Sequence, residues 1–205
     1  RGVLAHPRRA AARRGLSAPA ITATTPMPAF LFVLRDVILL RRGPQDMPYS
    51  PRLLVWVCGA SLLLQLAIAS VLAIPGDALG AGLIGLAFNL GVLLLLLQMR
   101  GMRGRFVQAA LALTSCAIVF AILSVPIVLA VGGKPPTPET ITPLQALLGM
   151  LALPIVVWKL IVDAHILRHS LNLPFAAGLL IALFWIIAEL SFGAAIGGPA
   201  AAAAA

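Results

Sequence analysis

The stretch LLVWVCGASLLLQLAIASVLAI, residues 53–74, decides the fold of this chain. It is 22 residues long and contains no charged side chain. About 20 apolar residues, rising about 1.5 Å each along a helix, cross the roughly 30 Å of hydrocarbon in a bilayer. The run is continuous and does not alternate, so it does not suit a strand of a membrane barrel. Since lipid offers no hydrogen-bond partner to the backbone, the sequence predicts a membrane-spanning helix.

Four more runs of the same kind follow along the chain. Hydrophobic residues make up 61% of the sequence, whereas soluble domains contain about 45–50%. The sequence therefore predicts an all-α polytopic membrane protein with five transmembrane helices. Their predicted bounds are 53–74, 79–99, 106–131, 144–163 and 173–196.

Arginine is concentrated on alternate sides of these spans. Nine arginines precede the first span, and the second-to-third and fourth-to-fifth connections carry more, whereas Lys134 is the one cation in the opposite loops. Under the positive-inside rule, the N-terminus is cytoplasmic and the C-terminus periplasmic. We expect the arginines next to the spans to contact anionic headgroups. These are Arg41, Arg42, Arg52, Arg100, Arg103 and Arg105.

The segments outside the spans differ in character. Residues 1–28 form a basic tail that is disordered or leader-like, or that precedes a true start at Met27. Residues 29–42 form an amphipathic helix, too short to span, that lies on the cytoplasmic leaflet or packs against the bundle or a partner. Residues 43–52 are predicted as a linker to the transmembrane domain 53–198, and residues 199–205 as a low-complexity tail. The Arg-, Ala- and Leu-rich composition favours a bacterial inner membrane over a mitochondrial one.

Few polar residues lie within the spans, and ionisable ones there are functional candidates because hydrocarbon disfavours charge. Glu189, in the outer half of the last span, is a candidate carrier site, or else a protonated acid bonded to a neighbouring helix; the sequence supplies no cation at its depth. Lys159 and Asp163 have i,i+4 spacing, which predicts an ion pair near the cytoplasmic end of the fourth span. The amides of Gln65 and Asn89 are expected to bond across helices.

Two histidines follow that pair. His165 and His169 also have i,i+4 spacing, which two metal ligands on one helix use. A third ligand is not near them in sequence, so we predict contact with headgroups or a partner, and no metal or cofactor. A quinone headgroup between a histidine and an aromatic such as Trp158 is an alternative.

Glycine pairs at GxxxG spacing predict close helix packing: Gly76 with Gly80, and Gly193 with Gly197. Pro126 and Pro154 interrupt two spans, and kinked helices can line a cavity. The net charge of +9, without a folded basic face or interleaved aromatics, favours anionic lipid over nucleic acid.

The organisation resembles the Yip-type family of small five-span membrane proteins. The resemblance covers roughly residues 27–198 and rests on the amphipathic stretch Phe30 to Leu40, the five spans, Pro126 and the inferred positions of the termini. It implies roles in membrane organisation, trafficking or assembly without catalysis.

No nucleotide-binding, metalloprotease or serine-hydrolase motif is present, so we expect no enzymatic activity. The leading hypothesis is an accessory subunit or assembly factor of a larger inner-membrane complex, respiratory or photosynthetic, in contact with other transmembrane proteins. One alternative is a small transporter or channel that uses Glu189 and the kinked helices. The other is a quinone- or metal-binding membrane subunit.

Overall fold

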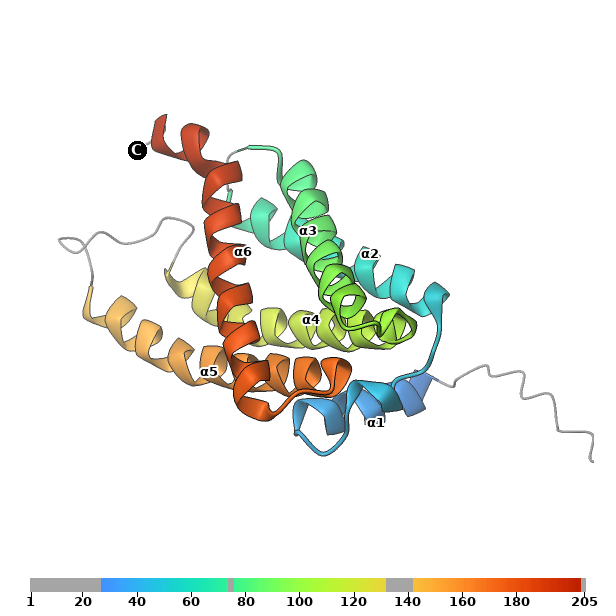
Figure 1. The fold of residues 1–205 in the computed structure, drawn as a ribbon. Coiled ribbons are helices and arrows are strands. Elements are labelled where there is room, and N and C mark those ends of the chain that lie inside the picture. Colours follow the sequence, from blue (N-terminus) through green and yellow to red (C-terminus); the bar gives the residue numbers. More distant parts are fainter. Residues whose placement is uncertain (1–26, 74–75, 132–141, 204–205) are drawn as a thin grey trace, which may run out of the picture.

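The computed structural model describes residues 27–73, 76–131 and 142–203, with the backbone alone for residues 27, 28 and 193–203. This part of the chain is helical and contains no strand. Figure 1 shows α6 crossing over α4 and α5, with α3 on the same side of the molecule and α1 beside the hairpin of α5 and α6. Of the predicted basic tail 1–28, residues 1–26 lie outside the described residues, and Met27 and Pro28 form the start of α1.

Within the described ranges, five helices are long and apolar enough to cross a membrane. This confirms the predicted fold class. The helices are α2 (Pro51–Val71), α3 (Ala78–Met99), α4 (Phe106–Val131), α5 (Pro143–Leu171) and α6 (Phe175–Ala203).

Local capping fixes where these helices begin. Ser50 Oγ accepts a hydrogen bond from the backbone N–H of Leu53 at the start of α2, at 3.3 Å. Asp77 Oδ1 caps α3 in the same way through the N–H of Gly80, at 2.9 Å. Thr142 and Gln145 form a capping box at the start of α5. Each cap satisfies backbone donors that the first turn of a helix leaves without partners.

The fourth span is longer than predicted. The sequence placed its end at residue 163, but α5 continues to Leu171 and ends at Asn172, whose φ of 53° is the left-handed conformation that closes many helices. The last two turns are not a loop because Ala164, Ile166 and Leu167 are buried in the bundle. Lys159 and Asp163 therefore lie well inside the helix, not at its end.

Helix α1 (Met27–Ile38) packs on the bundle, which is one of the arrangements that its sequence left open. Phe30, Leu34 and Val37 are buried, and the helix contacts α4 and α5. The indole Nε1 of Trp158 on α5 donates a hydrogen bond to the carbonyl of Ile38, at 3.2 Å. Phe32 on the opposite face is 60% exposed, so this face of α1 is the one available for contact with lipid.

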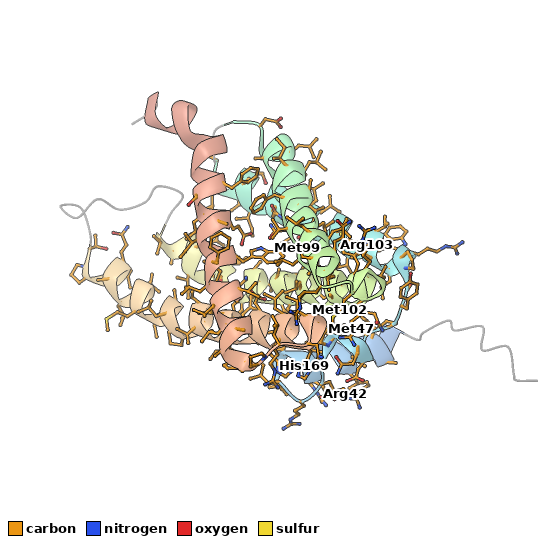
Figure 2. The ribbon with its side chains drawn as sticks, viewed as in Figure 1. Arg42, Met47, Met99, Met102, Arg103 and His169 are labelled. Carbon is orange, nitrogen blue, oxygen red and sulfur yellow. The ribbon has the colours of Figure 1, made fainter. Side chains whose placement is uncertain are left out.

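The predicted linker 43–52 is a folded segment. It contains the short 3-10 helix η1 (Pro44–Asp46), and Met47 is only 2% exposed. Gln108 Nε2 on α4 donates hydrogen bonds to the carbonyls of Gln45 and Met47, at 3.0 and 2.8 Å. Figure 2 shows Met47 close to Arg42 and His169 at this end of the molecule. The segment thus fastens α1 to the transmembrane helices.

Several of the predicted headgroup arginines bind protein groups. Arg105 Nη1, in the connection that includes η2 (Arg103–Arg105), donates to the carbonyl of His169 at 3.1 Å. Arg100 Nη2 donates to the carbonyl of Leu171 at 3.4 Å. Both cations meet the C-terminal end of α5, where helix carbonyls lack partners and the helix dipole is negative. Arg42 pairs with Asp36 at 3.3 Å.

The remaining arginines of that set are Arg41, Arg52 and Arg103. Within residues 27–73, 76–131 and 142–203 none of these three side chains makes an ion pair. They stay the better candidates for headgroup contact.

Helices α5 and α6 approach each other closely at a glycine that the GxxxG spacing did not predict. A Cβ at Gly178 of α6 would lie 2.7 Å from the carbonyl oxygen of Ala164 and 2.9 Å from Cβ of Arg168, both on α5. In contrast, Gly76 precedes α3 with a φ of 111° and no described atom near its Cβ position, and Gly80 faces only the cap residue Asp77 of its own helix. Gly193 and Gly197 belong to the part of α6 described by backbone alone.

A candidate binding cavity at mid-membrane

A cavity of about 220 Å³ lies among α2, α3, α4, α5 and α6. An engineered protein cavity of about 150 Å³ holds benzene, so this one has room for a somewhat larger molecule or several waters. Each of the five long helices contributes to its wall. The polar, charged and indole side chains in that wall are Ser61, Gln65, Asn89, Thr114, Lys159, Asp163, Trp185 and Glu189.

Three of these groups lie well away from the arginine-rich ends of their helices. Lys159 is twelve residues before the end of α5, about 18 Å along the helix, and Glu189 is fourteen residues after the start of α6, about 21 Å. Asn89 is ten residues before the end of α3, about 15 Å. The three side chains come together at the cavity, on helices that are long and apolar enough to cross a membrane.

Lys159 and Asp163 form the ion pair that their spacing predicts. Nζ and Oδ2 are 2.6 Å apart, and the two side chains are 31% and 14% exposed. The sequence placed this pair at the cytoplasmic interface, but both residues line the cavity. The cause is the extra length of α5, which carries the pair away from the helix end. Contrary to the sequence-based expectation, a cation does lie at the depth of Glu189, on the wall of the same cavity.

The orientation of the Asn89 amide is fixed by two neighbours: the indole N–H of Trp185 can only donate a hydrogen bond, and the carbonyl of Gly85 can only accept one. The indole N–H of Trp185 can only donate, and it lies 2.6 Å from Asn89 Oδ1. The amide nitrogen of Asn89 must then face the other way, where it donates to the carbonyl of Gly85 at 3.0 Å and to Glu189 Oε1 at 3.3 Å. Glu189 therefore accepts a hydrogen bond from Asn89. The cross-helix bond predicted for Asn89 is present, and it joins α3 to α6.

The other amide, Gln65, behaves differently. Its Nε2 donates to Ser61 Oγ on the same helix, at 3.4 Å, so the expected bond to another helix is not made among the described residues. Ser61 and Gln65 present oxygen and nitrogen atoms to the cavity from α2, and Thr114 presents a hydroxyl from α4.

Sequence reasoning missed Trp185. Its spacing of four residues from Glu189 puts both on one face of α6 and could have indicated it. One turn further along, Phe192 of α6 stacks on Phe88 of α3, with ring centroids 4.4 Å apart. This contact and the Asn89–Glu189 bond hold α3 against α6 beside the cavity.

The histidine pair lies outside the cavity. His165 Nε2 is 3.0 Å from the carbonyl of Arg42, and the rings of His165 and His169 meet edge to face with centroids 4.6 Å apart. In the part of the chain that the structure describes, no group of three or more His, Cys, Asp or Glu side chains could hold a metal ion. The pair instead fastens the segment after α1 to the end of α5.

No family model, no curated protein and no solved structure matches the chain. The resemblance to the Yip-type family therefore stays a prediction. What the geometry does establish is a partly open cavity among five long apolar helices, with several polar and charged side chains in its wall.

Proposed function

We propose that the chain is a small membrane transporter that binds a polar solute in the central cavity. The observation that carries this proposal is the joint lining of the cavity by Lys159, Asp163 and Glu189, on helices long and apolar enough to cross a membrane. Charged groups at this depth cost several kcal/mol in hydrocarbon, and they occur mainly where they line solute pathways or water-filled cavities. A purely structural role would need one satisfied pair, but here a third charged residue and two amides share the space.

The site also has the position expected of a transporter. Solute sites in such proteins lie near the bilayer midplane, between helices that belong to different parts of the fold. Pro126 and Pro154 lie inside α4 and α5, where each removes one backbone hydrogen bond and gives the helix a point at which it can bend. Bending at these points would open the cavity to either side.

Transport by this route is tested by filling the cavity. Ile186 lines the cavity, whereas its neighbour Ile187 is 53% exposed on the outside of α6. The purified protein is reconstituted into vesicles, and uptake of a panel of small labelled solutes is compared with that of protein-free vesicles. We expect the wild-type protein to take up at least one solute. Ile186→Trp should abolish this uptake, and Ile187→Trp should retain it. Permeability equal to that of protein-free vesicles, or equal loss in both variants, contradicts the proposal.

We also propose that the protein resides in a bacterial inner membrane with its arginine-rich end in the cytoplasm. The support is that α1, the α3–α4 connection and the α5–α6 connection meet at one end, bringing together the arginines of separate segments. Positive residues next to spans are retained on the cytoplasmic side. Labelling from the outside of intact cells should reach a cysteine at Gly76 and not one at Arg103; the reverse pattern contradicts this orientation.

A second candidate is the accessory or assembly subunit predicted from the sequence. The observation that favours it is the first half of α5, where Leu144, Met150 and Leu153 are 60% or more exposed. Partner transmembrane helices could cover this face as well as lipid does. Purification in a mild detergent with a stoichiometric partner supports that role, and recovery of the chain alone with full transport activity removes it.

A further inference from the structure

We propose that the cavity binds a small organic cation bearing a guanidinium or ammonium group, seated against Glu189. This inference rests on the proposed function, because it names the class of solute for the same cavity. Three features of the cavity support it: the charge balance of its wall, the free hydrogen-bonding capacity of Glu189 and the nature of the surrounding side chains.

The charge balance leaves one negative group uncompensated. Three ionisable side chains line the cavity, and Lys159 is engaged by Asp163 at 2.6 Å. Among the described residues, no cationic side chain lies within 4.0 Å of the Glu189 carboxylate. With all three groups ionised, the site therefore carries a net charge of −1, and a monovalent cation neutralises it.

Glu189 also has unused acceptor capacity. Its Oε1 accepts one bond from Asn89, and no described group donates to Oε2. A carboxylate accepts up to about four hydrogen bonds; two parallel N–H groups of a guanidinium fit it well, and an ammonium can donate to it through single N–H groups. Asn89 holds the carboxylate in place and in turn is held by Trp185, so the acceptor is positioned before a solute arrives.

The rest of the wall suits a cation that carries N–H donors. Trp185 contributes an indole, the aromatic group that attracts cations most strongly. Thr114 and Ser61 supply hydroxyl oxygens, and Gln65 an amide oxygen, as further acceptors. An anionic solute could pair only with Lys159, and the carboxylates of Asp163 and Glu189 would repel it. The volume of about 220 Å³ admits a compact molecule, not a peptide or a lipid.

Binding to the purified, detergent-solubilised full chain tests this inference with two probes of nearly equal shape. Methylguanidinium carries the charge and five N–H groups, and methylurea keeps the planar shape and three of the N–H groups but is neutral and has a carbonyl oxygen in place of one NH2 group. We expect titration calorimetry to show saturable binding of methylguanidinium and at least about tenfold weaker binding of methylurea, because a charge-assisted hydrogen bond is worth roughly 1.5–3 kcal/mol. Equal affinity for both probes, or no binding of methylguanidinium, overturns the inference.

Matched variants locate the site. Glu189→Gln keeps the shape of the side chain, removes the charge and should weaken methylguanidinium binding by at least about tenfold. Asp77→Asn makes the same chemical change at the start of α3, outside the cavity, where asparagine still caps the helix; it should bind like the wild type. Unchanged affinity in Glu189→Gln refutes the inference. Binding without any flux in the vesicle assay would overturn the transport proposal and leave the solute class standing, whereas Glu189-independent flux of neutral solutes would do the opposite.

Discussion

The contact at Gly178 allows a prediction of known direction and size. A Cβ there would lie 2.7 Å from the Ala164 carbonyl oxygen, against the 3.4 Å at which ordinary contact begins, so Gly178→Ala must separate α5 and α6 by about 0.7 Å. Both neighbouring atoms, the carbonyl oxygen and Cβ of Arg168, belong to or adjoin the helix backbone and cannot rotate away. Overpacking of this kind costs about 1–3 kcal/mol, and the better helix propensity of alanine returns up to about 1 kcal/mol. The expected net loss is about 1–2 kcal/mol.

Gly149 provides the matched control for this substitution. It lies on α5, and no described atom is within 4 Å of its Cβ position. Gly149→Ala should therefore leave the free energy of unfolding unchanged or raise it by up to about 1 kcal/mol. The measurement is reversible unfolding in mixed micelles, followed by circular dichroism. If Gly178→Ala proves as stable as Gly149→Ala, α5 and α6 are not in close contact, and the common depth of Lys159 and Glu189 loses its support.

Three other sets of substitutions test the contacts around the bundle. Lys159→Met and Asp163→Leu, made singly, should each lower stability in the same assay by about 1–3 kcal/mol because the partner charge is left alone, and the double variant should recover most of the loss. A double variant no more stable than the single variants would show that Lys159 and Asp163 are not coupled. Arg105→Gln should cost about 1 kcal/mol through lost bonds to the end of α5, whereas Arg103→Gln should change stability by less than about 0.5 kcal/mol; equal effects contradict the capping role. Gln108→Leu should release the segment after α1 and speed its hydrogen exchange, and unchanged exchange there would contradict the docking of that segment.

The helical fold could be predicted because lipid imposes a simple requirement on the sequence. An apolar run of about 20 residues must be helical, so composition and length alone identify the five spans. The end of α5 escaped this reasoning because His165, Arg168 and His169 end the apolar pattern while the helix continues. His165 Nε2 is directed to the carbonyl of Arg42 in the segment after α1, and no local pattern encodes such a partner.

Much of the candidate site was present in the sequence as separate residues. Glu189, Asn89, Lys159 and Asp163 were singled out by their depth in apolar spans, and the structure places all four on one cavity. Their convergence depends on how far α5 extends and on how closely α6 approaches it at Gly178. Both are consequences of tertiary packing, so a reading of single helices could not supply them.

Labelling at two adjacent residues tests the central claim that a polar, water-accessible cavity lies at mid-membrane. Ile186→Cys and Ile187→Cys are made in a chain whose Cys58 and Cys116 have been replaced, and vesicles are treated with a small water-soluble methanethiosulfonate. Ile186 faces the cavity and Ile187 is exposed on the lipid side, and a thiol reacts as the thiolate, which needs water around it. The account predicts rapid modification at 186 and little at 187. Faster modification at 187, or no modification at 186, would contradict it.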